Sequence, residues 1–76
     1  MNNLRRKSLR TIMEHLEELR AALEEVQEAE EEYRDNMPES LWGSKRYEKA
    51  EDAISNLEDA VSNIEEALSG IEEASA

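Results

Sequence analysis

The sequence predicts an all-α protein, an antiparallel two-helix hairpin that is coiled-coil-like and dimerises into a four-helix bundle. Three observations lead to this prediction. Residues 51–76 repeat one heptad almost four times, as EDAISNL, EDAVSNI, EEALSGI and EEASA. Apolar residues recur at steps of three and four in both halves of the chain, which places them on one stripe of a helix. A short segment that contains both proline and glycine separates the two halves.

The first helix is predicted over about residues 4–36. Helix-forming Glu, Leu, Ala, Arg and Gln fill the positions between its apolar residues. Only Glu30 interrupts the apolar series. The predicted seam of this helix consists of Leu9, Ile12, Leu16, Leu19, Leu23, Val26, Tyr33 and Met37.

A turn is predicted over residues 37–43, and a second helix over about residues 44–74. Pro38 disfavours helical geometry at the residue before it and lacks an amide donor. Gly43 permits a positive φ angle, and Ser44 is a suitable N-cap for the second helix. The predicted seam of the second helix consists of Tyr47, Ala50, Ile54, Leu57, Val61, Ile64, Leu68 and Ile71.

The two seams match if the turn is centred near Ser40, because partners then have numbers that sum to about 80. Val26 meets Ile54, Leu19 meets Val61 and Ile12 meets Leu68 in this register. Two helices cannot enclose a seam that is widened by flanking alanines, so an oligomer is expected, with a homodimer favoured and higher symmetric oligomers as the alternative. The residues expected in this oligomer seam are Leu9, Ile12, Leu16, Leu19, Leu23, Val26, Ile54, Leu57, Val61, Ile64, Leu68 and Ile71.

Composition narrows the class of protein. The 76 residues form one domain, 1–76, and contain no cysteine for disulfides or thiolate metal sites. A net charge of −11 argues against direct nucleic-acid binding. No apolar run is long enough for a membrane span, so a cytoplasmic protein is expected. His15 is the only histidine, and no catalytic, metal or cofactor motif is present. We therefore do not expect an enzyme.

Two features interrupt the heptads and are the candidate binding residues. One is the aromatic turn, which either caps the end of the bundle or offers a binding surface. The other is a pair of basic clusters, which either form salt bridges across the hairpin or bind an anion such as a nucleotide. The candidate residues are Tyr33, Trp42, Ser44, Lys45, Arg46 and Tyr47 near the turn, with Arg5, Arg6 and Arg10 near the start.

The segment 33–48, YRDNMPESLWGSKRYE, resembles a DNMPE-x-L-x-GS-x-RYE turn of small, uncharacterised Glu-rich helical proteins from Firmicutes phages and prophages. This resemblance implies an accessory protein in a phage-infected or lysogenic cell. Such a protein would antagonise host defence by binding a host protein or sequestering a nucleotide signal. The alternatives are a structural scaffold without a ligand and an acidic mimic of DNA.

Overall fold

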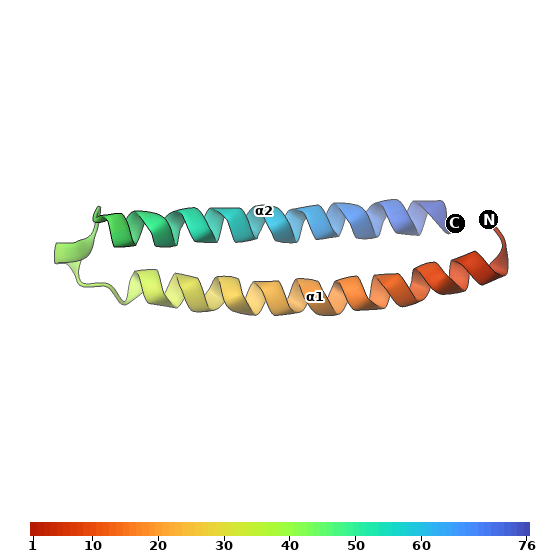
Figure 1. Ribbon diagram of the computed structural model, residues 1–76, viewed down its shortest axis with the longest axis horizontal. Coiled ribbons are helices and arrows are strands. Elements are labelled where there is room, and N and C mark those ends of the chain that lie inside the picture. Colours follow the sequence, from red (N-terminus) through yellow and green to blue (C-terminus); the bar gives the residue numbers. More distant parts are fainter.

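The computed structural model describes all 76 residues and consists of two long antiparallel helices joined by a tight turn (Figure 1). Helix α1 covers Asn3–Asp35, the 3-10 turn η1 covers Glu39–Leu41, and helix α2 covers Lys45–Ala74. The molecule is 59 Å long but only 15 Å and 12 Å in the other two directions. The helical hairpin predicted from the sequence is confirmed.

The ends of the helices are set by local hydrogen bonds. The Asn2 side chain accepts a bond of 2.8 Å from the Arg5 amide and caps α1. The Ser44 hydroxyl accepts a bond of 3.2 Å from the Tyr47 amide and caps α2, as its position in the sequence predicts. Between the helices, Gly43 has a φ of 81° and is the only residue with a positive φ. These contacts fix where the chain reverses.

Helix α2 buries the stripe that its heptads predict. Ala50, Ile54 and Leu68 are buried, and the other aliphatic members of the stripe are half-buried. Helix α1 turns a different line toward α2, which we call the facing line. Its members, none of them fully exposed, are Leu9, Met13, Leu16, Arg20, Leu23, Gln27, Glu30 and Arg34.

Part of the predicted α1 seam therefore lies outside the hairpin. Ile12, Leu19 and Val26 are 46%, 57% and 55% exposed, and Tyr33 is 47% exposed. The expectation that these residues fill layers against α2 is wrong for the hairpin. The apolar arc of α1 spans about three columns of side chains, and one partner helix covers about two of them. One edge of the arc must stay uncovered.

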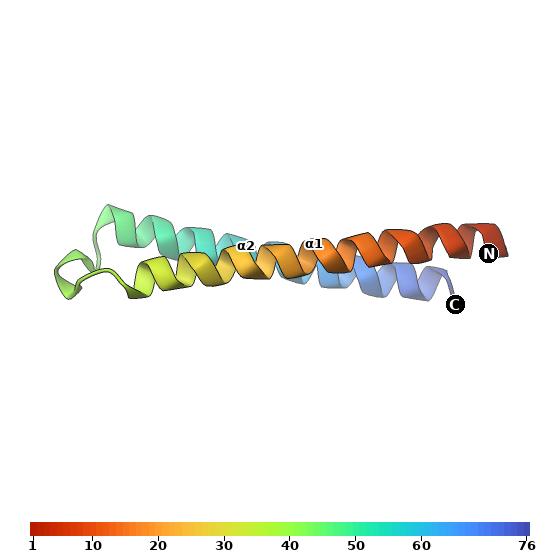
Figure 2. The ribbon, with the colours of Figure 1, turned by 90° about the horizontal axis from the view of Figure 1, so that it is seen from below.

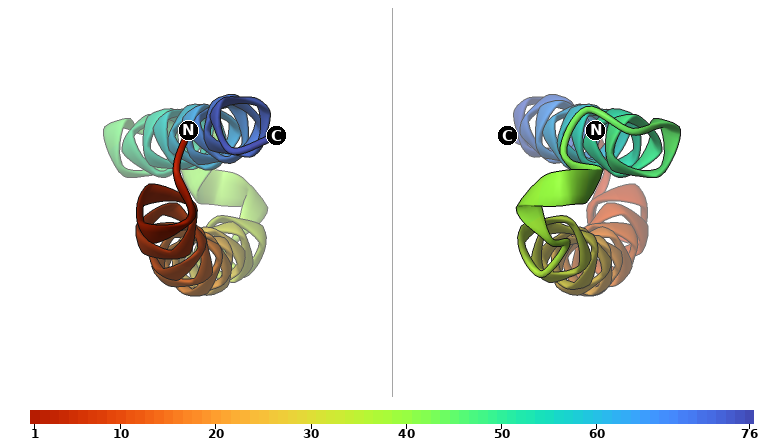
Figure 3. Two further views of the ribbon diagram at one scale, coloured as in Figure 1. Left: turned by 90° about the vertical axis from the view of Figure 1, so that its right-hand side faces the viewer. Right: turned by 90° about the vertical axis from the view of Figure 1, so that its left-hand side faces the viewer.

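The hairpin is a single layer with a thin core. Figure 2 shows the two helices crossing at a small angle, and Figure 3 shows them end-on with only the turn that contains η1 beside them. Only four residues are buried, and Met37 in the turn is one of them. One hydrogen bond, from Arg6 Nε to the Ser75 carbonyl at 3.2 Å, joins the two termini.

Candidate functional site

One of the two hollows of the molecule lies beside the turn, between the end of α1 and the beginning of α2. It has a volume of about 320 Å³. We call it the turn-end hollow, and it is lined by Glu30, Tyr33, Lys45, Arg46, Lys49 and Ala50. The structure thus brings together three of the residues predicted from the sequence, namely Tyr33, Lys45 and Arg46.

Three cations surround this hollow without an ion-pair partner. The only salt bridges in the structure join Arg20 to Glu24 and Arg34 to Asp35. The salt bridges expected across the hairpin are therefore absent. Glu30 lies in the hollow but is not within ion-pairing distance of the lysines or of Arg46. A hollow with three free cations and one carboxylate has a net positive charge, although the chain as a whole is acidic.

The start of α2 adds backbone donors to the same region. The amides of Lys45 and Arg46 donate to no acceptor in the chain, whereas the Tyr47 amide is taken by Ser44. Unpaired amides and the helix dipole both favour negative charge at a helix N-terminus. The Ser44 hydroxyl is used as a cap, so it is positioned to shape the helix start rather than to contact a ligand.

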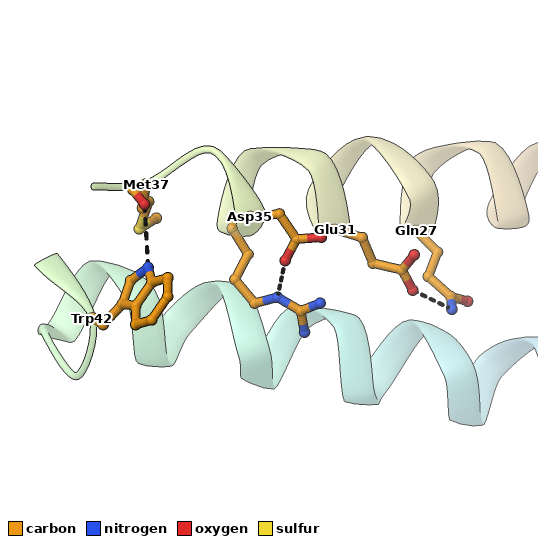
Figure 4. A network of polar contacts seen from close by, with 6 residues as sticks. Gln27, Glu31, Asp35, Met37 and Trp42 are labelled. Atoms are coloured by element: carbon orange, nitrogen blue, oxygen red, sulfur yellow. Dashed lines mark hydrogen bonds and ion pairs between the residues drawn. The ribbon is translucent and has the colours of Figure 1, made fainter. Parts of the chain in front are cut away.

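The aromatic turn is partly a cap and partly exposed. Trp42 Nε1 donates a hydrogen bond of 3.2 Å to the Met37 carbonyl, which Figure 4 shows from close by. The Trp42 and Tyr47 rings lie 6.4 Å apart at an angle of 42°, while Met37 is 7% exposed. Trp42 remains 55% exposed. Neither Trp42 nor Tyr47 lines the turn-end hollow, where Tyr33 is the only aromatic residue.

The second basic cluster lies at the opposite end of the molecule. Arg5, Arg6 and Arg10 belong to the first turns of α1, and α1 runs along most of the 59 Å length. Arg6 donates to the Ser75 carbonyl and to the Asn3 side chain. The structure therefore does not place these arginines with the turn-end hollow, and the two clusters are separate.

One long edge of the hairpin is acidic. A second hollow of about 380 Å³ on this edge is lined by Glu24, Gln27, Glu28, Glu31, Glu58, Val61 and Ser62. Three polar residues of the facing line bond to carboxylates of their own helix. Arg20 pairs with Glu24. Gln27 donates to Glu31 and Arg34 donates to Asp35 (Figure 4). The hydrogen bond that Arg34 Nε donates to the Asp35 carboxylate raises the pKa of Arg34 above its ordinary value. We call this side the acidic edge.

Lys49 is the cation of the hollow that was not among the predicted site residues. It is exposed and lies one helical turn after Lys45 and Arg46, so helical spacing alone places it on their side of α2. Ala50, one residue further on, is small and buried, and it leaves room for the hollow beside Glu30.

Comparison with known proteins gives no match to a family model, a curated protein or a solved structure. The structure contains no group of three or more histidine, aspartate or glutamate side chains arranged to hold a metal ion. Neither helix has a stretch that is long and apolar enough to cross a membrane. The turn-end hollow and the surfaces of the hairpin are therefore the candidate functional features of the molecule.

Proposed function

We propose that this protein is a non-enzymatic helical binding protein that works as a dimer and binds a small phosphorylated anion in the turn-end hollow. The observation that supports this most is the position of Lys45, Arg46 and Lys49 around one hollow without carboxylate partners. Phosphate groups are the ligands that such clusters of cations and helix amides favour.

A nucleotide fits these groups better than a simple anion. Tyr33 lines the hollow and is 47% exposed, so one face of its ring is available to stack on a base. The cations would hold the phosphates, and no group in the hollow is arranged as a nucleophile with an activating base. Binding without turnover is the expected outcome.

Dimerisation is part of this proposal because the hairpin has so few buried residues. A chain of 76 residues with only four buried side chains gains little from its own core. Two such hairpins form an antiparallel four-helix bundle when their uncovered faces meet. Exposed Ile12, Leu19 and Val26 would then have partners.

The resemblance of the turn to phage and prophage proteins supports a biological context for this binding. In that context the protein would sequester a nucleotide signal that a host defence system needs. The sequestering function requires tight binding and no chemistry. It also requires many copies, which a short chain without a cofactor can supply.

The proposal is tested by titrating the protein with a panel of nucleotides, including cyclic dinucleotides, and with inorganic phosphate in a calorimeter. We expect binding of at least one nucleotide, and we expect Arg46→Glu with Lys49→Glu to weaken it roughly a hundredfold or more because two cation contacts become repulsive. Circular dichroism of the variant should remain helical.

The matched control is Lys7→Glu with Arg10→Glu, which changes the net charge by the same amount at the far end of the molecule. This control should bind the nucleotide nearly as well as the wild-type protein. Absence of binding to every member of the panel contradicts the proposal. Equal losses in the two variants would mean that total charge, and not the hollow, governs binding.

The acidic edge favours a second candidate function. Glu24, Glu28, Glu31 and Glu58 gather around one hollow, and rows of carboxylates on a rod imitate the charge of a nucleic acid. Such a mimic would occupy the basic surface of a nucleic-acid-binding protein. The two candidates differ in what they bind: a small anion at the turn end, or a basic protein surface along the edge.

A further inference from the structure

The hairpin has one long apolar face that its own chain covers only in part, because Ile12, Leu19 and Val26 are exposed while Ala53 and Ala60 are half-buried. Its first half is the outer column of α1, which recurs every seven residues and consists of Ile12, Leu19, Val26 and Tyr33. Its second half is the alanine column of α2, which has the same spacing and consists of Ala53, Ala60, Ala67 and Ala74. Together with the residues between them, we call this surface the open face.

The two columns lie on the same side of the hairpin. Each outer-column residue comes one position before a residue of the facing line, as Ile12 precedes Met13. Ala53, Ala60 and Ala67 each come one position before a residue of the α2 stripe, as Ala53 precedes Ile54. In two antiparallel helices, these preceding positions point to the same side. The lining of the turn-end hollow supports this placement. Tyr33 belongs to the outer column, and Arg46 continues the alanine column because it lies seven residues before Ala53. Both residues line the hollow.

The open face carries no charge from Ile12 to Ala29 on α1 and from Ala53 to Gly70 on α2, although 38% of the chain is charged. Charged residues occur on this side at the turn end, where Glu30, Arg46 and Lys49 line the turn-end hollow. The positions beside the two columns are uncharged, namely His15, Ala22 and Ala29 on α1 and Asn56, Asn63 and Gly70 on α2. Apart from Glu30, the acidic residues of the helices lie on the other sides, including the acidic edge. Exclusion of charge from one face is typical of a surface that is buried in an assembly.

We propose that the open face binds the open face of a second copy of this chain. This inference rests on the dimer proposed above and identifies the surface through which it forms. A net charge of −11 makes two copies repel one another, and the open face is the side on which they approach without bringing carboxylates together. An interface between identical copies must complement itself, and this face contains both halves of such a match.

The outer column of one copy and the alanine column of the other complement each other in side-chain size. The outer column presents large side chains and the alanine column presents small ones, with the same seven-residue spacing. Leu19 lies level with Ala60, and Val26 with Ala53, because Tyr33 and Arg46 share a hollow and the helices run in opposite directions. A twofold axis parallel to the helices puts Leu19 of one copy over Ala60 of the other. Large residues then fit against small ones in each layer, and both turns lie at the same end.

The first test is sedimentation equilibrium of the wild-type protein and of the Leu19→Glu, Val26→Glu variant at micromolar concentration. We expect the wild-type mass to be twice the 8.7 kDa of one chain. The variant buries two unpaired charges in the interface, so its self-association should be roughly a hundredfold weaker or more. The matched control, Ser55→Glu with Ser62→Glu, adds the same charge at the same spacing off the open face and should remain dimeric.

The outcomes separate this inference from the function proposed above. A monomeric wild-type protein overturns both the dimer and this interface, but leaves anion binding at the hollow to its own test. A dimeric wild-type protein whose Leu19→Glu, Val26→Glu variant is equally dimeric overturns the open face alone.

Cysteine cross-linking tests the same interface without destabilising charges, because the natural chain has no cysteine. Chains with Leu19→Cys are mixed with chains with Ala60→Cys and oxidised gently. We expect the mixed disulfide to form several-fold faster than either homodimeric disulfide. The control pair, Glu18→Cys and Asp59→Cys, lies off the open face and should cross-link slowly. Equal rates for the two pairs would overturn the proposed layers.

Discussion

Replacing Leu68 by alanine is expected to lower the free energy of unfolding by about 2–4 kcal/mol. Leu68 is 8% exposed and is one of only four buried residues, so its loss leaves a cavity in a core with few other contacts. Urea unfolding followed by circular dichroism at a fixed protein concentration measures the effect. The concentration must be fixed because dimerisation contributes to the measured stability.

Leu4→Ala is the matched control for this prediction. It removes the same atoms from a leucine that is 74% exposed, so the change in unfolding free energy should be within about 0.5 kcal/mol. A small effect at Leu68, comparable to that at Leu4, would show that the stripe of α2 is not the core of the hairpin.

Met37→Ala is expected to have the second large effect, a loss of about 2–4 kcal/mol. Met37 is 7% exposed, so shortening its side chain removes apolar contacts from the inside of the turn. The carbonyl that accepts the Trp42 indole hydrogen bond belongs to the main chain and is kept in the variant. The same urea experiment measures this loss. A large value means that the aromatic turn contributes to stability as a cap, whatever else its exposed part binds.

Leu41→Ala is the comparison for Met37→Ala because it lies in the same turn and is 36% exposed. Its loss should be below about 1 kcal/mol. Equal losses at the two positions would mean that the turn has no particular core around Met37, and the interpretation of Trp42 as part of a cap would be wrong.

The sequence predicts the second half of the fold more accurately than the first half. In α2 each heptad has one apolar stripe between pairs of acidic residues, so only one side of the helix can be buried. Ala50, Ile54 and Leu68 are buried as this pattern requires. The turn is also predictable from the sequence because Pro38, Gly43 and Ser44 each have a specific conformational preference.

The buried side of helix α1 is harder to predict from the sequence because the apolar pattern fits two lines of residues. Leu9, Leu16 and Leu23 belong to both lines, and hydrophobicity alone selects Ile12, Leu19 and Val26 as their neighbours. The hairpin instead places Met13, Arg20 and Gln27 toward α2. Which line of α1 faces α2 depends on how the apolar arc of α1 is divided between α2 and the proposed second copy of the chain. A rule that pairs only two helices does not include the second copy. The uncovered apolar residues now indicate where another hairpin belongs.

The candidate site was also only partly predictable from the sequence. Lys45, Arg46 and Tyr33 share the turn-end hollow because the turn brings the end of one helix to the start of the next. Trp42 and Ser44 were expected in the site from their closeness in sequence. Their hydrogen bonds instead hold the turn and the helix start, to the Met37 carbonyl and from the Tyr47 amide. Proximity in sequence does not specify which groups remain free to bind.

The two long sides of the hairpin are chemically opposite. One is the acidic edge, where carboxylates gather, and the other is the open face, which is uncharged except at the turn end. Pairing through the open face would leave a rod with acidic outer edges. The cationic turn-end hollows would remain near one end. In such a dimer the acidic edges stay available to partners, and the turn-end hollow adjoins the interface through Tyr33, which belongs to both.

The most direct measurement of this account is an isotope-filtered nuclear Overhauser experiment on a mixture of carbon-13-labelled and unlabelled chains. The account predicts contacts from the methyl groups of Leu19 and Val26 to Ala60 and Ala53 of the other copy. If the Leu19 and Val26 methyl groups instead show contacts only to Val61 and Ile54 of their own chain, these residues belong inside the hairpin. That result would contradict both the facing line of α1 and the open face.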